Sequence, residues 1–229
     1  MFDSFPMPLA ILIPAYNAAV SLPGVLGGVF RFVPPQDVLV VDDGSSDGTR
    51  EAAERAGVHV VTHPINRGKG AALKTGFSWA LDRGYEAVIA LDADGQHDPE
   101  SVPDFVRKWK ESGADLVVGS RMANRHGMPL ARVCSNAMTS WVISRRAGQR
   151  IEDSQSGYRL IAAEVLRRVS LETDGYEMES ELLIKAARSG FQIVSVPIRT
   201  VYADETSFIH PLRDTGRFIA LVWRSLSWA

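Results

Sequence analysis

The sequence predicts an α/β fold in which a mostly parallel sheet carries helices on both faces. Short apolar runs alternate with longer stretches of helical period, and continuous runs of Val, Ile, Leu and Ala are typical of buried parallel strands. Sheets of this type bind ligands beyond the carboxyl ends of their strands, so functional motifs are expected just after the runs. The apolar runs span residues 9–13, 38–41, 58–62, 87–91 and 116–118.

Polar motifs follow these runs in a regular way. Residues 14–17 follow the first run, 42–47 the second and 92–98 the fourth, while 66–70 come soon after the third. Polar clusters at corresponding strand ends of one sheet converge on a single cleft, whereas scattered loop polarity has no such register. We therefore expect one functional site at this edge of the sheet.

The remainder of the chain gives no sign of a second domain. A basic segment rich in Ser and Asn (121–150) is followed by a polar segment (153–159), then by a helix and a strand that end near Pro197. A length of 229 residues with 45% hydrophobic content suits one large α/β domain. Because no internal repeat or low-complexity linker divides the chain, a single domain over residues 1–229 is expected.

Composition excludes several classes of protein. The 25 basic and 27 acidic residues give a net charge of -2, so no global field attracts nucleic acid, and none is expected as a partner. Cys134 is the only cysteine, which excludes an intrachain disulfide or a zinc cluster and suits the cytoplasm. Residues 1–4 do not resemble a secretion signal, and no apolar run approaches the ~20 residues that span a bilayer. We expect a cytoplasmic protein that is soluble or bound to a membrane surface.

Asp92, Ala93 and Asp94 form the most informative motif. The two alternate carboxylates directly follow an apolar strand and offer hard oxygen ligands suited to Mg²⁺ or Mn²⁺. A cation held there can bind a pyrophosphate and neutralise charge on a departing nucleoside diphosphate. The alternative is a capped turn, which we accept for Asp98 because Pro99 follows it, as at a helix start. For the first two acids a cation is favoured, since two carboxylates that close a buried strand repel each other without one.

Asp42 and Asp43 place two more acids at a strand end. There a carboxylate can accept hydrogen bonds from a base imino group or from ribose hydroxyls. The alternative is local, with Ser46 or Asp47 capping a helix that begins near Thr49. Taken alone, the motif leaves both interpretations open.

Residues 66–70 bring glycines and a cation to the same edge, as a phosphate-binding loop does. Lys69 is followed by Gly70 rather than by Ser or Thr, so the loop is not a Walker A motif. On its own this loop is a weak signal.

The joint order of the motifs is more specific than any one of them. They occur as 14–17, 42–45, 66–70, 92–99, 119–121 and 153–159. In this order the chain resembles family 2 glycosyltransferases of the dolichol-phosphate mannose synthase type, from about residue 9 to residue 217. The resemblance implies a GT-A fold with a nucleotide-binding sheet. It also implies an inverting, metal-dependent transfer of a sugar from a GDP- or UDP-sugar, most characteristically to a polyprenyl phosphate such as dolichyl or undecaprenyl phosphate.

The resemblance further implies a donor half over about 9–120, an acceptor half over about 121–210 and a terminal helix over 211–229. Catalysis and metal binding would centre on Asp92, Asp94 and Gln96, with Arg121 between the donor and acceptor phosphates. The nucleotide sugar would be bound by Pro14, Tyr16, Val41, Asp43, Lys69, Asp92, Ala93, Asp94 and Gln96. The acceptor phosphate would be bound by Arg121, Arg132, Ser135 and Arg199.

Two positions depart from the family pattern. Ala18 stands where Glu is usual, which removes a nucleotide contact. Thr206 stands where Lys is common, which weakens the case for a phosphate acceptor or moves that task to Arg199 and Arg213. Two alternatives therefore stay open, namely a glycosyltransferase with a soluble hydroxyl acceptor and a catalytically inactive sugar-nucleotide-binding subunit of a membrane complex.

The nature of the acceptor decides the expected role of Asp153. A phosphate monoester is already anionic at neutral pH and attacks an anomeric carbon without a strong general base, so cations that hold two anions together suffice. A hydroxyl acceptor requires a base, for which Asp153 is the catalytic candidate. The alternative for Asp153, Gln155 and Arg159 is a hydrogen-bonded turn that only shapes the pocket.

Residues 212–228 predict an amphipathic terminal helix. Arg213, Arg217 and Arg224 gather on one side of it, with apolar and aromatic residues mostly opposite. Such a helix suits a lipid interface, where a polyprenyl acceptor is found. The alternative is a terminal helix packed on the domain or on a second copy. Many relatives append transmembrane helices after this point, whereas this sequence stops there. Peripheral attachment or a membrane protein partner is therefore expected.

Overall fold

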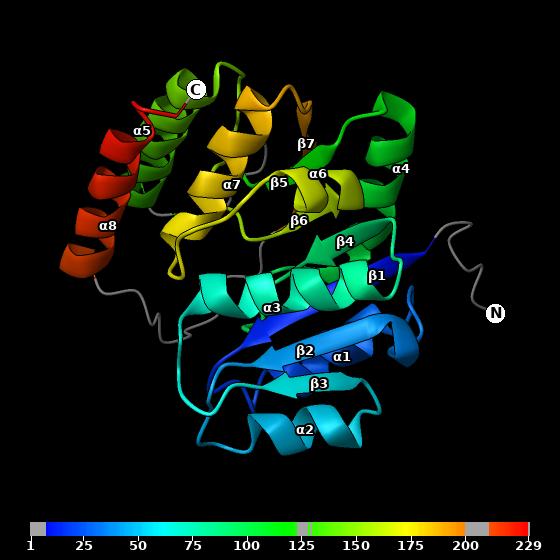
Figure 1. Cartoon of the computed structure of the whole chain (residues 1–229). Helices are drawn as coiled ribbons and strands as arrows, with labels where there is room; N and C mark the ends of the chain where they lie inside the picture. The colour runs from blue at the N-terminus through cyan, green and yellow to red at the C-terminus, as the bar shows by residue number, and fades with distance from the viewer. Residues whose placement is uncertain (1–7, 123–127, 129, 200–210, 229) are drawn as a thin grey trace.

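One side of the sheet in the computed structural model is parallel as predicted, and its middle contains one reversed strand. The structure describes residues 8–122, 128, 130–199 and 211–228. Within them, seven strands form a sheet in the order β3-β2-β1-β4-β6-β5-β7, and only the pairs of β6 are antiparallel (Figure 1). The strands are β1 Leu9–Ala15, β2 Val38–Asp42, β3 His59–Thr62, β4 Ala87–Ala90, β5 Leu116–Ser120, β6 Arg159–Ala162 and β7 Ile193–Pro197.

Helices cover both faces of this sheet. Buried side chains of α1, α2 and α4 pack on one face, and those of α3, α5, α6 and α7 pack on the other. α8 packs against α7, outside the second layer (Figure 1). The helices are α1 Leu22–Val29, α2 Thr49–Arg55, α3 Lys69–Asp82, α4 Val102–Ser112, α5 Leu130–Ala147, α6 Ala163–Arg168, α7 Glu177–Arg188 and α8 Pro211–Arg224, with short 3-10 helices η1 Pro35–Asp37 and η2 Pro99–Ser101.

Two strands differ from the prediction. The run 58–62 is predicted to be buried, but β3 is partly exposed because it lies at the edge of the sheet and pairs only with β2. β6 is absent from the prediction because the strand is only four residues long and begins with a charged residue, Arg159. This short strand joins β4 to β5, so the donor and acceptor halves of the chain share one sheet.

Several strands extend one or two residues beyond their predicted ends. Pro14, Asp42 and Ser120 are therefore strand residues, and the polar motifs after β1, β2 and β4 start within two residues of a strand end. Among the described helices, none has both the length and the apolar character that are needed to cross a bilayer.

Candidate active site

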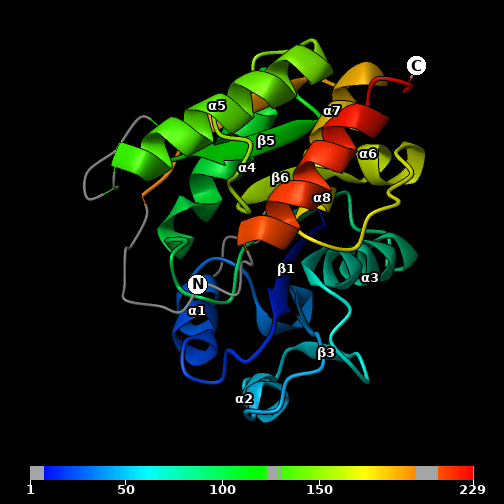
Figure 2. The ribbon, with the colours of Figure 1, turned by 90° about the vertical axis from the view of Figure 1, so that its left-hand side faces the viewer.

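The strand-end motifs meet at one edge of the sheet. Ala15 pairs with Asp42, and Asp42 pairs with Thr62, so β1, β2 and β3 end level with one another. The N–H of Leu91 donates to the carbonyl of Leu12, which brings the end of β4 to the same edge. Figure 1 shows these carboxyl ends on one side of the molecule, and Figure 2 views the molecule from that side.

Hydrogen bonds join the loop after β1 to the loop after β2. Asn17 donates its N–H to Ser45 Oγ at 2.9 Å, and its Oδ1 accepts from the N–H of Ser46 at 3.0 Å. The N–H of Ala18 donates to Thr49 Oγ1 at 2.7 Å. These bonds hold Asn17 in a left-handed conformation with φ of 50°, which Asn tolerates better than most residues. The two loops therefore form one connected unit.

Asp47 is part of this connection, although the N-cap of α2 is Gly48 and not, as one alternative predicted, Ser46 or Asp47. Its Oδ1 accepts from the N–H of Thr49 at 3.1 Å, and its Oδ2 accepts from the N–H of Ala19 at 3.0 Å. Partial burial acts to raise the pKa of Asp47, but the hydrogen bonds from Thr49 and Ala19 outweigh it and lower the pKa. The carboxylate stays charged and helps to begin α2.

Asp43 anchors the glycine-rich loop. This residue is 3% exposed, and its carboxylate accepts from the N–H groups of Arg67 at 3.0 Å and Gly68 at 2.8 Å. His63 Nδ1 lies 2.6 Å from Asp43 Oδ1, while His63 Nε2 lies 3.0 Å from Thr75 Oγ1. His63 thus connects Asp43 to α3. Sequence reasoning missed His63, and its only signal is a histidine directly after an apolar run.

The glycines of this loop are required by close packing. A Cβ at Gly68 or Gly70 would lie 2.6 to 2.8 Å from the backbone of Asp174. The N–H of Ala71 donates to the carbonyl of Asp174 at 3.0 Å. Gly68 also has φ of 99°, a conformation that favours glycine. The segment before α7 therefore fixes the start of α3, where backbone N–H groups and the helix dipole favour an anion.

Lys69 lies between two carboxylates at the start of α3. Its Nζ is 2.5 Å from Asp92 Oδ1 and 3.3 Å from Glu179 Oε2. Burial acts to lower the pKa of Lys69, but the charges of Asp92 and Glu179 raise it above its ordinary value. A Cβ at Gly157 would lie 2.7 Å from both Lys69 Nζ and Asp92 Oδ2, so a larger residue there would require the ends of these two side chains to shift.

The same interactions keep Asp92 ionised. Burial acts to raise its pKa, but the cation of Lys69 and, to a smaller extent, His97 hold the pKa at about 2. His97 Nδ1 accepts the N–H of Asp92 at 3.1 Å, which places its proton on Nε2. Burial lowers the pKa of His97 despite the nearby Asp92 and Asp94, so this ring is neutral at pH 7.

Asp94 belongs to a tight turn that leaves its second oxygen available. Asp94 Oδ1 accepts from the N–H of Gln96 at 2.9 Å, and Gly95 between them has φ of 76°. Asp98 caps the following helical turn by accepting from the N–H of Glu100 at 3.0 Å, which confirms the capping prediction. Ala93 is buried at 5% exposure, so it separates the two acids rather than facing a ligand with its methyl group.

The donor set of this turn fits a hard divalent cation that shares its ligands with a substrate. Asp92 and Asp94 supply carboxylate oxygens and Gln96 a neutral amide oxygen, which suits Mg²⁺ or Mn²⁺. Within the described part of the chain, no group of three His, Cys, Asp or Glu residues could hold a metal ion. Mg²⁺ that is bound together with a nucleotide usually has one or two carboxylate ligands from the protein. Water and phosphate oxygens fill its remaining coordination positions.

Arg121 directly follows β5, at the same edge of the sheet. Its Nε and Nη2 each donate to Asp153 at 2.8 Å, in the bidentate arrangement that fixes a guanidinium most firmly. Asp153 is fully buried and also accepts the N–H groups of Arg121 at 3.1 Å and Gln155 at 3.3 Å. With its acceptor positions filled, Asp153 orients Arg121, which favours the positioning interpretation. A role for Asp153 as a base stays a prediction.

Arg159 is a second buried cation, and it shapes the loop that contains Asp153. It is 2% exposed and donates to the carbonyls of Ser156, Glu179 and Ser154 at 2.8, 2.7 and 2.9 Å. Burial lowers the pKa of Arg159, yet the nearby carboxylates and the full set of acceptors keep it charged. Loop 153–157 therefore folds around a guanidinium, as the turn alternative for Arg159 predicted.

Comparison with known proteins identifies the family. Residues 10–175 match the model of glycosyl transferase family 2. The chain belongs to this family. It is 38% identical to the undecaprenyl-phosphate mannosyltransferase of Micrococcus luteus, over 85% of this chain and 84% of the relative. It is 35% identical to the polyprenol monophosphomannose synthase of Mycolicibacterium smegmatis, over 82% of this chain and 75% of the relative.

The solved structures confirm the fold of this glycosyltransferase. Glucosyl-3-phosphoglycerate synthase from Mycobacterium tuberculosis, solved with Mn²⁺, uridine diphosphate and phosphoglyceric acid, has a TM-score of 0.75 and 21% identity. The match covers 98% of this chain and 80% of that chain. The predicted GT-A fold, a mostly parallel sheet with helices on both faces in a single domain, is therefore confirmed.

The remaining predicted site residues of the glycosyltransferase are placed unevenly. Pro14 is the penultimate residue of β1, and Tyr16, which is 36% exposed, directly follows the strand. Val41 is fully buried in the core, so any contact with a nucleoside would come from its backbone. Arg199 is exposed just after β7, whose pairing with β5 brings it to the edge that carries Arg121.

Other predicted acceptor residues lie on α5 or outside the described residues. Arg132 and Ser135 are exposed on the first turns of α5. The segment 200–210, which includes Thr206, lies outside the described residues, as does the side chain of Arg213.

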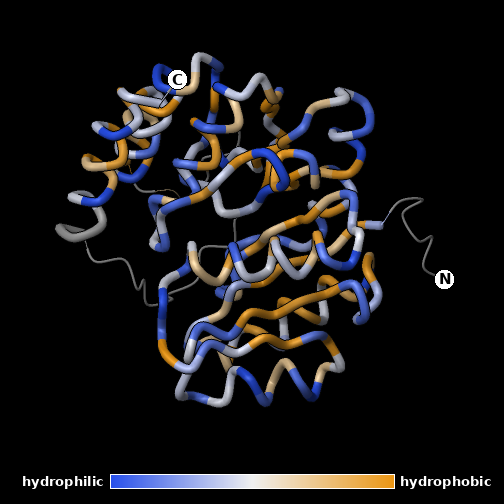
Figure 3. The backbone as a smooth tube through the Cα atoms, viewed as in Figure 1, coloured by the Kyte–Doolittle hydropathy of each residue, from blue (hydrophilic) through white to orange (hydrophobic). Residues whose placement is uncertain are grey.

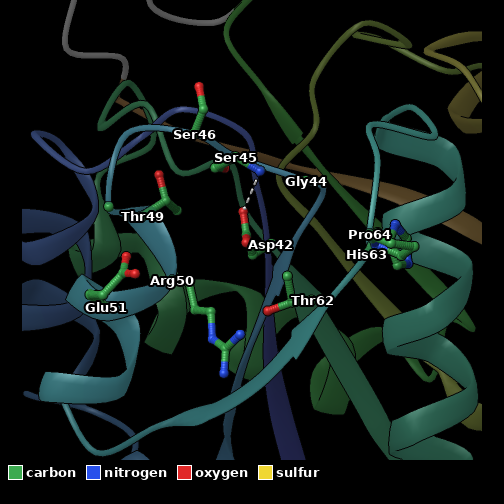
Figure 4. A pocket seen from close by; sticks show the side chains of 11 residues that line it. Asp42, Gly44, Ser45, Ser46, Thr49, Arg50, Glu51, Thr62, His63 and Pro64 are labelled. Atoms are coloured by element: carbon green, nitrogen blue, oxygen red, sulfur yellow. Dashed lines mark hydrogen bonds between the residues drawn. The ribbon is translucent and has the colours of Figure 1, made fainter.

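A pocket of about 330 Å³ lies among the ends of β2 and β3 and the start of α2 (Figure 4). Its lining residues come from 42–51 and 62–64, and they include Arg50 and Glu51 of α2. Figure 4 shows Asp42 at its centre, where the Asp42 carboxylate accepts the N–H of Ser45 at 3.1 Å. The hydropathy view in Figure 3 shows hydrophobic strand interiors behind polar loops at this edge.

Proposed function

We propose that this glycosyltransferase moves a mannosyl residue from a nucleotide-activated mannose to the phosphate of a polyprenyl phosphate. The observation that carries the proposal is the fixed pair Arg121 and Asp153, which holds a cation at the strand edge that also carries Asp92 and Asp94. The names of the two similar bacterial relatives support both the sugar and the acceptor class.

The donor diphosphate would lie against Asp92, Asp94 and Lys69. Asp92, Asp94 and Gln96 would hold Mg²⁺ or Mn²⁺, which supplies Lewis-acid stabilisation of the departing nucleoside diphosphate. In this structure Lys69 Nζ lies 2.5 Å from Asp92 Oδ1 and neutralises its charge. When the donor binds, the Lys69 side chain can turn to the diphosphate oxygens while its backbone stays at the start of α3. This exchange of partners keeps the local charge balanced when the donor binds.

The nucleoside would lie along the ends of β1 and β2. Tyr16 is exposed there for stacking on a base. Asp43 is held by His63 and the loop 66–70, and its N–H donates to the carbonyl of Ala15, next to Tyr16 in the chain. Among the described residues, the Asp43 Oδ2 atom accepts only the N–H of Gly68, so it retains capacity for a ribose or base donor.

The acceptor phosphate would lie beside Arg121, with Arg199, Arg132 and Ser135 as further ligands. A phosphate oxygen forms the bond to the anomeric carbon as the bond from that carbon to the diphosphate oxygen breaks, which inverts the configuration. The nucleophile is already an anion, so Asp153 need not accept a proton. Its task is to hold Arg121 where the two anions approach each other.

Reconstitution of the purified protein tests the proposal. GDP-mannose, UDP-glucose and UDP-GlcNAc are supplied with Mn²⁺ or Mg²⁺ and detergent-solubilised undecaprenyl phosphate, and glycolipid product is measured by mass spectrometry. Mannosyl transfer that needs the metal and disappears in Asp94→Ala is expected. Transfer to a soluble sugar alcohol but not to the lipid would replace the proposal with the hydroxyl-acceptor alternative. Cytoplasmic-face peripheral association with a membrane belongs to the same proposal, because the acceptor is a lipid.

A further inference from the structure

α5 leaves large apolar side chains exposed on its outer face. Leu130, Met138 and Trp141 are 77, 66 and 64% exposed. The face turned into the protein buries Ile143 and Ala147 together with the polar residues Asn136 and Ser140. A helix on a globular domain normally buries its apolar stripe, so an exposed stripe of large side chains indicates a contact beyond this chain.

α8 presents a second exposed stripe. Ile219, Trp223 and Leu226 recur at helical spacing and are 51, 71 and 58% exposed. Leu221 and Ser225 are buried on the opposite side of the helix. The helix therefore packs on the domain, as one alternative predicted, and still leaves apolar side chains outward.

The two stripes belong to neighbouring helices. Arg146 of α5 donates through Nε to Ser225 Oγ at 2.9 Å, at the end of α8. Figures 1 and 2 both show α5 and α8 side by side on the side of the molecule where the parallel strands end. We call their outward residues the two-helix surface, which consists of Leu130, Met138, Trp141, Ile219, Trp223 and Leu226. These are six of the nine large hydrophobic residues that are exposed among the described residues.

The charge around the two-helix surface identifies its partner. The sequences of α5 and α8 contain six arginines and a single acid, Asp214, although the whole chain has a net charge of -2. Arg145, Arg217 and Arg224 are exposed. Aromatic side chains flanked by arginines suit the interface of a bilayer that contains anionic lipids. A second copy of this chain would bring one arginine-rich surface against another, which like-charge repulsion opposes.

We propose that the two-helix surface docks the protein on an anionic lipid bilayer and, resting on the proposed function, presents Arg121 to a lipid phosphate. The buried face of α5 contacts the catalytic loop directly, since the N–H of Ser154 donates to Ser140 Oγ at 2.9 Å. Ser154 follows Asp153, which holds Arg121. The lipid surface and the acceptor site therefore lie on opposite sides of one helix, about 10 Å thick.

Vesicle binding tests the docking surface without any acceptor. Wild-type protein is sedimented with vesicles of phosphatidylcholine and of phosphatidylcholine with 30 mol% phosphatidylglycerol. Binding to the anionic vesicles is expected, and Met138→Ser/Trp141→Ser/Trp223→Ser is expected to weaken it at least about tenfold through lost apolar burial. Val20→Ser, which changes a residue 96% exposed outside these helices, is the matched control and binds like wild type.

Two further measurements separate the contribution of the arginine charges from that of the tryptophan side chains. Arg145→Gln/Arg224→Gln is expected to abolish the preference for anionic vesicles. Brominated lipids are expected to quench Trp141 and Trp223, so Trp141→Phe and Trp223→Phe each reduce the quenched fraction of the fluorescence. Equal binding of the triple serine variant and the Val20→Ser control would overturn the proposal. Self-association of wild type in sedimentation velocity without vesicle binding would overturn it as well and assign the surface to a second copy.

Transfer to a short-chain, water-soluble polyprenyl phosphate in the absence of vesicles distinguishes this proposal from the proposed function. The triple serine variant is expected to retain wild-type transfer in that assay, and a loss there would contradict a purely lipid-docking role. If the wild-type protein transfers mannose but does not bind vesicles, the docking proposal is contradicted and the proposed function is not. Absence of transfer with intact vesicle binding would remove the proposed acceptor alone.

Discussion

Asp153 holds the guanidinium of Arg121 with two parallel hydrogen bonds of 2.8 Å while having no exposed surface of its own. A buried carboxylate is costly unless its oxygens are filled, and here Arg121 and the N–H of Gln155 fill them. The pair therefore behaves as one unit, in which the acid fixes a cation at the edge of the sheet.

Asp153→Asn tests this division of roles. The amide keeps the shape but offers one acceptor and repels one arginine donor, so we expect kcat to fall by about 10 to 100-fold while donor affinity changes little. Steady-state kinetics over pH 6 to 9 with the lipid phosphate acceptor, and calorimetry with the donor, measure the two effects. The pH profile should keep its shape, since Asp153 carries no proton in the reaction. A much larger fall in kcat together with loss of the acidic limb of the profile would instead establish Asp153 as a base.

Asp94→Ala tests the metal site against a neighbouring control. We expect loss of metal-dependent donor binding and a decrease in kcat of about 1,000-fold or more, because the departing diphosphate loses its cation. Asp98→Ala removes only a cap that accepts from the N–H of Glu100, so it should cost about 1 kcal/mol of unfolding free energy and retain metal-dependent binding. Calorimetry with and without Mn²⁺ and urea denaturation compare the two variants. Equal donor binding by wild type and Asp94→Ala would contradict the metal assignment.

Gly70→Ala tests the packing of the loop that starts α3. The new Cβ would lie 2.7 Å from the carbonyl oxygen of Gly175, so we expect destabilisation of about 1 to 3 kcal/mol and weaker donor binding. Gly27→Ala is the control, because its Cβ would meet nothing within 4 Å, and helix propensity there should make the change neutral or stabilising. Urea denaturation monitored by circular dichroism measures both. A Gly70→Ala protein as stable as the control would show that the backbone of 174–175 can move away.

Glu181, which is not one of the proposed metal ligands, makes a pH-dependent contribution to the free energy of unfolding. Burial acts to raise its pKa, but hydrogen bonds from Lys185, Thr173 and the N–H of Glu172 lower it below its ordinary value. Because the folded-state pKa is depressed, this stabilisation is present above the unfolded value of about 4.3 and is lost as pH falls through the folded value. Glu181→Gln should therefore destabilise the protein at pH 7 and reduce the loss of stability between pH 5 and pH 3.

Urea denaturation at several pH values measures this effect, and Glu164→Gln is the control. Glu164 is exposed and lies 3.7 Å from Arg167, so its replacement should leave the pH dependence unchanged. Parallel stability curves for Glu181→Gln and wild type would contradict the role assigned to Glu181.

Local patterns predicted which strand ends carry the polar motifs, because each motif follows an apolar run that marks a strand. The pairing of Lys69 with Asp92 could not be read from the sequence, since 22 residues separate them and only the parallel packing of β1 and β4 brings α3 to the turn. The strand that begins at Arg159 was equally hidden, because its pairing is long-range. Periodicity also identified an apolar stripe in the terminal helix, but it could not show that α5 turns its own stripe outward.

The pairing of β6 has a consequence for the proposed positions of the two substrates. This strand pairs with β4, which leads to the turn of Asp92 and Asp94, and with β5, which leads to Arg121. One ladder of backbone hydrogen bonds therefore connects the two positions that we propose for the donor diphosphate and the acceptor phosphate. Under the proposed function, the sheet itself sets the spacing between leaving group and nucleophile before either substrate binds.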